Sequence, residues 1–265
     1  LCHDAIGLLE TSSDTQERDT KMYAILNRLR PLCLATQKYS EAMDISRKML
    51  AIREKDSGSD VGMEYFHVAE VYQALRDTTK ALSYVDSIMN NGGKPSVDPM
   101  MEGRHLQLVG MLHGRFGKWD EAVRYYEKAD SAMASMGSDR ERLWLGSLKA
   151  SALYNAKRLD ESEAEYSRYY QGCRKVYGDD ADVTITALNY LANIRAYSGR
   201  LEEGSGNLLD VKERMTRKIA ERLRFLPSET RESYLDNFLD VTFRMTAYGF
   251  KSGHTSDEFT ENAWE

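Results

Sequence analysis

The sequence is poor in residues that break helices, cross-link chains or enter membranes. Only 4 of its 265 residues are proline and 18 are glycine, so long helices can run with few interruptions. It contains no run of 18 apolar residues, and we therefore expect no membrane-spanning helix. The three cysteines, Cys2, Cys33 and Cys173, are too few and too scattered to build a disulfide framework or a zinc site.

A basic excess and a recognisable catalytic pattern are also missing. With 36 basic and 42 acidic residues the formal net charge is -6, which argues against general nucleic-acid binding. The motifs of zinc peptidases, P-loop NTPases and serine hydrolases do not occur. His105 and His113 have no acidic residue or cysteine at metal-ligand spacing, so we expect them to be packing or surface residues. We predict no active site, no metal and no cofactor in this chain.

What the sequence does contain is a short pattern that recurs at nearly even intervals. The pattern is a bulky residue, two polar residues that often include glutamate, and then a small residue. Its five copies are Tyr39–Ala42, Thr78–Ala81, Trp119–Ala122, Leu159–Ser162 and Leu201–Gly204. The small residues are spaced by 39, 41, 40 and 42 positions, and a period of this length indicates a repeat architecture.

The surroundings of each copy predict two antiparallel helices joined by a tight turn. Twelve positions before the small residue, four copies carry a second small residue: Ala69, Gly110, Ala150 and Ala192. Gly117 and Gly199 lie where the first helix would end and the second begin. Short facing side chains let two helices approach closely, and such a pair must stack on its neighbours to bury its apolar faces.

This pattern resembles the tetratricopeptide repeat. The longer period, with connectors such as Cys173–Val183 and its Gly-Asp turn, resembles the extended repeats of kinesin light chains. The resemblance implies an all-α, right-handed superhelix (α-solenoid) of helix-turn-helix repeats with C-terminal capping helices. Pro31 and Gly204 depart from the pattern, because proline interrupts a helix and glycine is a poor helix former.

The repeats set the expected division of the chain. We expect residues 1–18 to be a partial leading helix and residues 19–211 to hold about five repeats. Residues 212–265 are then C-terminal helices that lead to a further domain. The start at Leu1-Cys2, without methionine, also suggests a fragment of a longer protein.

Beyond the repeats the texture of the sequence changes. Residues 205–225 predict a long helix, and its basic side chains are expected to be solvated unless an acidic partner meets them. These basic residues are Lys212, Arg214, Arg217, Lys218, Arg222 and Arg224. Pro227-Ser228-Glu229 predicts the start of another helix. Residues 249–254 predict a break, and Thr255 the start of a last helix.

The tail carries a second resemblance. Phe225–Glu229, Arg231–Leu235 with Phe238, and Glu258–Trp264 are similar to the segment between tetratricopeptide repeats and a CHAT domain. CHAT domains are caspase-like cysteine peptidase domains that are frequent in bacterial proteins. The resemblance implies that this chain is the N-terminal regulatory region of a larger CHAT-type peptidase protein, whose catalytic residues would follow the present sequence.

Stacked helix pairs present a concave groove lined by the first helix of each pair. Positions three before and one after the first small residue lie four apart on one helix face. In the last copy these are Asn189 and Asn193, whose amides can grip the backbone of an extended peptide. The corresponding and neighbouring groove residues in other copies are Ser147, Ser151, Tyr154, Asn155, Arg104, Gln107, Met111, Arg115, Phe66 and Glu70. The resemblance implies the same face, because peptide-binding members of the family use it.

The expected function is therefore a non-catalytic scaffold that binds a protein or peptide segment. Arg104 and Arg115 would suit an acidic ligand or a C-terminal carboxylate. The bland interpretation also stands, because polar residues on an exposed helix face are usually only solvated. Nucleic acid is not an expected partner, whereas intramolecular contact with a downstream domain is a further option. The residues favour a cytoplasmic location and leave an envelope or secreted one open.

Two other functions are kept as alternatives. The array can be the sensory region of a bacterial signalling protein, such as a histidine kinase or a transcription regulator, because similar repeats precede those domains. It can also be an enzyme with carboxylates clustered in a helical cavity. The absence of any spaced catalytic constellation in the sequence speaks against this last alternative.

Overall fold

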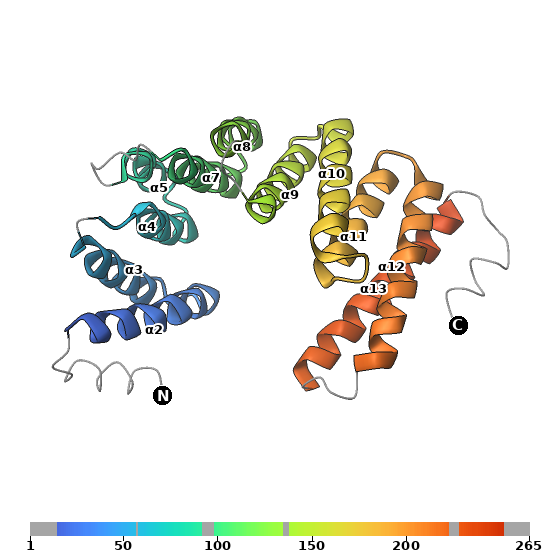
Figure 1. The fold of residues 1–265 in the computed structure, drawn as a ribbon, viewed down its shortest axis with the longest axis horizontal. Coiled ribbons are helices and arrows are strands. Elements are labelled where there is room, and N and C mark those ends of the chain that lie inside the picture. Colours follow the sequence, from blue (N-terminus) through green and yellow to red (C-terminus); the bar gives the residue numbers. More distant parts are fainter. Residues whose placement is uncertain (1–14, 57, 92–97, 135–137, 223–227, 252–265) are drawn as a thin grey trace. The chain divides into compact units, whose positions relative to one another are not determined.

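The computed structural model describes residues 15–56, 58–91, 98–134, 138–222 and 228–251 (Figure 1). Within these ranges every regular element is helical and no strand occurs, which confirms the all-α fold class. The helices are α2 (Thr15–Ala35), α3 (Tyr39–Glu54), α4 (Gly62–Ala74), α5 (Thr78–Ser83), α6 (Val85–Met89), α7 (Pro99–Arg115), α8 (Trp119–Met133), α9 (Asp139–Asn155), α10 (Leu159–Tyr177), α11 (Asp182–Tyr197), α12 (Leu201–Arg222) and α13 (Ser228–Lys251).

The chain forms two compact units. Helices α2 to α8 belong to the first and helices α9 to α13 to the second. Within each unit, the two helices of each pair pack on one another, and each pair packs on the next. Each unit is thus a stack of helix pairs, as the sequence pattern predicts.

The same turn joins the two helices of all five pairs. The pairs are α2 and α3, α4 and α5, α7 and α8, α9 and α10, and α11 and α12. Three residues separate the first helix from the second, and the middle one has a positive φ angle. These middle residues are Gln37, Arg76, Gly117, Lys157 and Gly199. In each turn the amide of the next residue donates to the carbonyl five positions earlier, as Lys118 does to His113 at 3.0 Å. This is the bonding of a Schellman motif, which satisfies carbonyls that the end of a helix leaves open.

The small residues of the repeat lie where the paired helices come closest. The residues of the second helices, Ala42, Ala81, Ala122, Ser162 and Gly204, are all buried. A Cβ atom on Gly110 would lie 2.6 Å from the ring of Tyr126. A Cβ atom on Gly204 would lie 2.8 Å from the carbonyl oxygen of Ala192. Glycine at position 204 is therefore required by the close approach of α11 and α12.

This approach gives a testable expectation for α12. Replacing glycine by alanine in a helix normally stabilises it by about 1 kcal/mol. At Gly204 the added methyl meets backbone atoms that cannot rotate away, so we expect Gly204→Ala to lower the free energy of unfolding by about 1–2 kcal/mol. Gly206 has no atom within 4 Å of its Cβ position, so Gly206→Ala should stabilise instead. Urea unfolding of the two variants checks this expectation. Changes in the free energy of unfolding that have the same sign in both variants would contradict it.

Burial of the apolar positions holds each unit together. The core of the second unit joins α9 to α13 and includes Leu188, Leu191, Leu208 and Met245. The first unit has smaller clusters, of which the one around Phe66, Val109 and Leu112 joins α4, α5, α6 and α7. Cys33 and Cys173 are buried in α2 and α10 as free thiols.

The helix boundaries differ from the sequence-based ones at several points. Helix α2 continues through Pro31 to Ala35. The second helix of the second pair is broken at Tyr84 into α5 and α6. Helix α12 crosses the expected boundary at residue 211, and α13 continues through Gly249, where we expected a break. Most of the expected leading helix, at 1–14, and the last expected helix, at 255–265, lie outside the described residues.

Candidate functional site

A cavity of about 550 Å³ lies on the first-helix face of the second unit. Helices α9, α11 and α13 supply most of its wall, and each presents residues about one helical turn apart. The lining residues are Ser151, Tyr154, Asn155, Tyr166, Asn189, Tyr190, Asn193, Ile194, Tyr197, Asp240, Arg244 and Tyr248. A volume of this size fits a short polypeptide segment or a small ligand.

The side chain of Arg244 organises the polar part of this cavity. Its Nη1 atom donates to Oδ1 of Asn189 at 3.0 Å and to Oδ1 of Asn193 at 2.5 Å. Its Nε atom donates to Asp240 at 2.9 Å, one turn earlier on α13. The hydroxyl of Tyr248 also donates to Oδ1 of Asn193, at 3.3 Å. Because donors hold both amide oxygens, the amide nitrogens are the groups that these asparagines offer to a ligand.

Tyrosines form much of the rest of the cavity wall. Tyr154 and Tyr197 have ring centroids 5.6 Å apart, and Tyr166 and Tyr190 are 5.4 Å apart. Tyr197 is 64% exposed and Tyr190 46%, which leaves large aromatic surfaces open to solvent. Burial raises the pKa of Tyr166 to about 12. A wall of tyrosine and asparagine with one arginine has the composition of protein-binding surfaces.

Two further tyrosines of this wall keep their protons at neutral pH. Burial raises the pKa of Tyr154, with the neighbouring Tyr197 as a lesser cause. Burial also raises the pKa of Tyr248 above its usual value. The single proton of Tyr248 is the one donated to Asn193.

Five groove residues expected from the sequence line this cavity. They are Ser151, Tyr154, Asn155, Asn189 and Asn193. Ser147 lies outside it, and its hydroxyl donates to the carbonyl of Trp144 at 2.7 Å. Sequence reasoning missed Asp240, Arg244 and Tyr248, whose spacing of four residues repeats that of Asn189, Asn193 and Tyr197. Ligand contact by these residues stays a prediction.

In the first unit, two of the expected groove residues are engaged by contacts within the chain. Glu70 is buried, and its carboxylate forms ion pairs with Arg30 and with Arg115, the latter at 2.5 Å. The guanidinium of Arg115 also lies over the ring of Phe66, 5.7 Å from its centroid. The exposure that a groove contact needs is therefore missing at Phe66 and Glu70, which lie in the packing between helices.

In α7, the first helix of the third pair, one expected groove residue is likewise buried. Gln107 is buried in α7, whereas Met111 is half-buried and Arg104 is exposed. Arg115, which we expected to be available for an acidic ligand, already contacts the carboxylate of Glu70. The groove predicted from the repeat contains a cavity in the second unit, whereas Phe66, Glu70 and Gln107 of the first unit are buried.

His67, next to this cluster, makes the stability of the first unit depend on pH. It is buried in α4, and its Nδ1 atom has no hydrogen-bond partner. Burial, aided by the positive charge of Arg30, lowers the pKa of His67 from 6.5 to about 3. The folded pKa lies below the unfolded one, so the unfolded chain takes up the proton first and stability falls as the pH drops below about 6.5.

We expect His67→Phe to flatten this pH dependence. For the wild-type chain the loss approaches about 1.4 kcal/mol per pH unit between pH 6 and pH 4. Urea unfolding of both proteins at several pH values measures the difference in their free energies of unfolding. Both chains have the same carboxylates, so the contribution of the carboxylates cancels in this difference. Parallel pH profiles would contradict a neutral, buried imidazole at this position.

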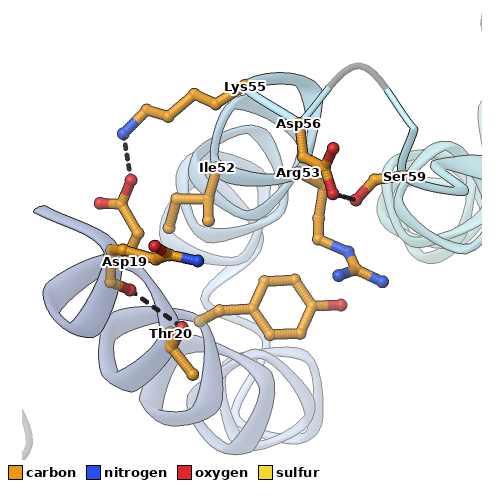
Figure 2. A pocket seen from close by; sticks show the side chains of 9 residues that line it. Asp19, Thr20, Ile52, Arg53, Lys55, Asp56 and Ser59 are labelled. Carbon is orange, nitrogen blue, oxygen red and sulfur yellow. Dashed lines mark hydrogen bonds and ion pairs between the residues drawn. The ribbon is translucent and has the colours of Figure 1, made fainter.

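A second cavity, of about 440 Å³, lies between α2 and α3 in the first unit (Figure 2). Its charges are paired locally, with Lys55 bound to Asp19 at 2.5 Å and Ser59 to Asp56 at 2.8 Å. Tyr23, also in its wall, donates to the buried carboxylate of Glu64 at 2.6 Å. Burial raises the pKa of Glu64. These contacts are internal, and they give the cavity no evident ligand.

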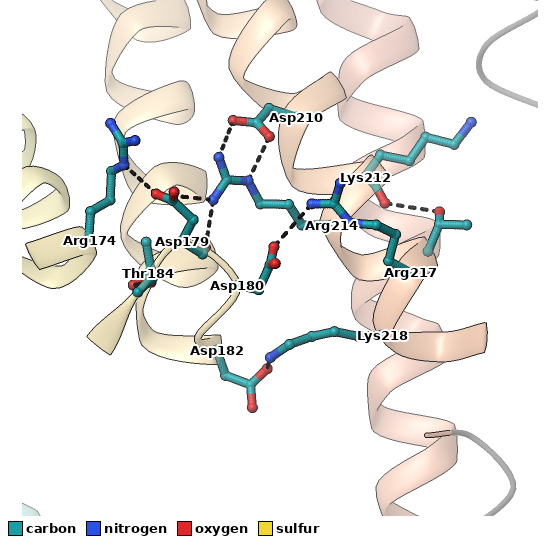
Figure 3. A network of polar contacts seen from close by, with 12 residues as sticks. Arg174, Asp179, Asp180, Asp182, Thr184, Asp210, Lys212, Arg214, Arg217 and Lys218 are labelled. Atoms are coloured by element: carbon teal, nitrogen blue, oxygen red, sulfur yellow. Dashed lines mark hydrogen bonds and ion pairs between the residues drawn. The ribbon is translucent and has the colours of Figure 1, made fainter. Parts of the chain in front are cut away.

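The basic stretch of α12 is matched by acidic residues of the chain itself (Figure 3). Arg217 pairs with Asp180 at 3.0 Å, in the turn after α10, and Lys218 pairs with Asp182, the first residue of α11. Arg214 is held by Asp210 at 2.6 Å. The Gly-Asp connector therefore docks on α12. The stretch expected to be solvated is in part a contact between neighbouring helices.

The remaining candidates for chemistry have structural partners. Nε2 of His105 lies 2.8 Å from Asp60, and the imidazole of His113 stacks on Tyr125 at 5.1 Å between ring centroids. Across the described ranges no three His, Cys, Asp or Glu side chains are grouped to hold a metal ion. Within the same ranges no helix is long and apolar enough to cross a bilayer.

Comparisons with known proteins identify the fold. No family model matches the sequence, and no curated protein matches it. Solved structures do match: TPR-like repeats of the kinesin-light-chain type from Podosopora anserina are 16% identical, with a TM-score of 0.60 over 77% of this chain and 97% of that one. At this identity the likeness concerns the fold alone, which is that of TPR-like repeat proteins.

Two further structures have the same fold in other contexts. A STAND protein with a tetratricopeptide repeat sensor from Pyrococcus horikoshii is 16% identical, with a TM-score of 0.63 over 99% of this chain and 38% of that one. A Rap protein complexed with competence and sporulation factor is 14% identical, with a TM-score of 0.55 over 93% of this chain and 69% of that one.

Proposed function

We propose that this protein is a protein-protein interaction module whose second unit holds an extended segment of a partner in the cavity between α9, α11 and α13. The observation that carries the proposal is the pair Asn189 and Asn193, fixed by Arg244 with their amide nitrogens left for a ligand. Backbone carbonyls of an extended chain are spaced regularly and accept such donors whatever the side chains are.

The aromatic wall supports the same function. Tyr190 and Tyr197 offer exposed ring surface, which stabilises a bound segment by apolar contact at a small cost in side-chain entropy. Two proteins of the same fold are in keeping with it, since one was solved complexed with a factor and the other contains a repeat sensor. Asparagine donors for the backbone and tyrosine surfaces for the side chains predict broad rather than strict sequence preference.

A selection from a random peptide library tests the proposal. The full chain is the target, and the doubly substituted chain Asn189→Ala/Asn193→Ala is the counter-target. We expect peptides that bind the wild-type chain and are lost on the counter-target. Arg168→Ala, at an exposed position of α10, is the matched control and should keep them. Enrichment of the same peptides on the counter-target would overturn the proposed site.

The assignment of this array to a CHAT-type peptidase protein rests on the sequence resemblance alone. That the array regulates a CHAT-type peptidase remains our preferred setting, because residues 225–265 resemble the segment that precedes such domains. Many of these residues lie outside the described ranges. The test is the coding sequence after Glu265: caspase-like His and Cys motifs would support the assignment, and a kinase or DNA-binding domain would favour the signalling alternative.

A further inference from the structure

The cavity of the second unit offers hydrogen-bond donors where α11 faces it. Arg244 donates to the amide oxygens of Asn189 and Asn193, and Tyr248 also donates to that of Asn193. The two amide nitrogens are left for a ligand. Among the described lining residues the carboxylate is that of Asp240, and Nε and Nη2 of Arg244 engage it at 2.9 and 2.7 Å. This wall suits a ligand that has many acceptors and few donors.

An ordinary extended peptide meets this condition poorly. It has one N–H for every C=O, and an N–H that is buried without an acceptor costs affinity. Proline lacks the N–H and keeps the C=O. A run of prolines adopts the polyproline II conformation, in which no internal hydrogen bond uses the carbonyls. A proline-rich segment is therefore the backbone that matches the asparagine donors of α11.

Tyrosines on the same helix provide flat apolar surface at a matching interval. Tyr190 and Tyr197 are exposed, and each ring lies against a second tyrosine of the wall: Tyr166 at 5.4 Å and Tyr154 at 5.6 Å between ring centroids. The exposed pair is seven positions apart, which places both residues on one face of α11, about 10.5 Å apart along its axis. A polyproline II helix advances about 9.3 Å per turn of three residues. Two prolines three positions apart can therefore contact the two rings.

Asn193 places one of the donors between these two aromatic surfaces. It follows Tyr190 by three positions and precedes Tyr197 by four, so it lies within about one helical turn of each. Proline-rich segments generally dock in grooves lined by aromatic side chains, and their preformed conformation reduces the entropy lost on binding. Rings for the prolines and a donor for the carbonyl between them are both present on α11.

We propose that this cavity binds a proline-rich segment in the polyproline II conformation, with prolines three positions apart on Tyr190 and Tyr197 and carbonyls on Asn189 and Asn193. The proposal rests on the peptide-binding function proposed above and narrows it to one class of ligand. The cavity selects a backbone that lacks N–H groups, and it leaves the side chains between the two prolines open.

Titration calorimetry of the full chain with synthetic peptides tests the ligand class. The probe is a peptide of nine prolines with acetylated and amidated ends. The reference is (Gly-Ser)4-Gly with the same ends, which has the same length and charge but keeps its N–H groups. We expect the proline peptide to bind at least about tenfold more tightly. Equal affinities, or no binding of the proline peptide, would overturn the proposal.

Two further peptides separate the missing N–H from the proline ring. (Pro-Ala)4-Pro and (Pro-Sar)4-Pro both lack every second ring, but alanine restores an N–H and sarcosine, which is N-methylglycine, does not. We expect the sarcosine peptide to bind more tightly than the alanine peptide, by about fivefold or more. An alanine peptide that binds as tightly as the peptide of nine prolines would refute the match between the donors and the backbone.

Variants of the chain establish that the peptide lies on the two tyrosines. Tyr190→Ala/Tyr197→Ala removes both exposed rings and should weaken binding of the proline peptide by about tenfold or more. Tyr177→Ala, at an exposed tyrosine outside the cavity lining, is the matched control and should leave binding unchanged. Equal losses in the two variants would contradict the proposed contact, and so would full binding by Asn189→Ala/Asn193→Ala. Circular dichroism of each variant establishes that the helices are intact.

Failure of the ligand class can be told apart from failure of the peptide site. Suppose that the random library yields peptides that depend on Asn189 and Asn193 but lack prolines three positions apart, and that the proline peptide does not bind. The ligand class is then wrong, and the proposed function stands. Selected peptides that bind equally to the doubly substituted counter-target would remove the site and the ligand class together.

Discussion

Replacing Glu70 by leucine is expected to lower the free energy of unfolding of the first unit by about 3 kcal/mol, because it leaves a buried arginine without its counter-charge. Arg30 is almost fully buried and faces the Glu70 carboxylate, whereas Arg115 is partly exposed and can turn to water. Leucine nearly preserves the volume of the side chain, so the loss reports the charge and not a cavity. Hydrogen exchange of α4 and α7 in the full chain, followed against urea, measures it.

Two control variants separate the ion pair from general damage to the packing. Arg30→Met/Glu70→Leu removes both charges and should recover most of the stability, since two apolar side chains need no partner. Glu41→Gln breaks an exposed pair with Lys38 and should change stability by less than about 0.5 kcal/mol. A single Glu70→Leu variant as stable as the wild-type chain would show that the carboxylate does not support the fold. It would restore Glu70 as a candidate ligand contact.

The fold was predictable because its determinants are local and repeated. Each turn contains one positive-φ residue, and each close approach of paired helices contains a small residue. Both features recur at a nearly constant spacing in the sequence. Gly204 illustrates the limit of propensity reasoning. As a helix former it is a departure from the pattern, yet the carbonyl of Ala192 leaves no room for any larger residue. Packing between helices decides the residue, and propensity does not.

The contents of the groove were predictable only in part. The repeat register correctly brought Asn189 and Asn193 to one cavity with Ser151, Tyr154 and Asn155. It could not show that the carboxylate of Glu70 forms ion pairs with Arg30 and Arg115, which lie 40 and 45 positions away in the sequence. One signal was present, since the first copy has Arg30 where the other copies have alanine or glycine. A long cation at a close-packed position needs a partner anion, and Glu70 is the one it meets.

Arg244 escaped prediction for a different reason. It lies 51 positions after Asn193, outside the period of about 40 that defines the repeats. Helix α12 is 22 residues long and lengthens this interval, so α13 falls out of phase with the first helices of the five pairs. The signal that remains is the match between two triads with a spacing of four, which becomes meaningful only when the helices are seen side by side.

Because Arg244 holds both asparagines, we expect Arg244→Leu to have the second large effect. The variant should bind peptides selected on the wild-type chain about 10- to 100-fold more weakly. The substitution removes two hydrogen bonds that fix the amides of Asn189 and Asn193, each worth about 0.5–1.5 kcal/mol of orientation. Asp240, which loses its partner, is largely exposed and stays solvated, so the fold should persist. Titration calorimetry with one selected peptide measures the change.

Arg244→Lys distinguishes orientation of the amides from direct attraction of a charged ligand. Lysine keeps the positive charge but lacks the planar fork that reaches both asparagines and Asp240 at once. If Arg244 acts by fixing the amides, the lysine variant should bind as weakly as the leucine variant, and affinity should vary little with salt. If affinity returns with lysine and falls steeply as salt is added, the arginine binds an anionic group of the ligand directly. In that case the asparagines are no longer the centre of the site.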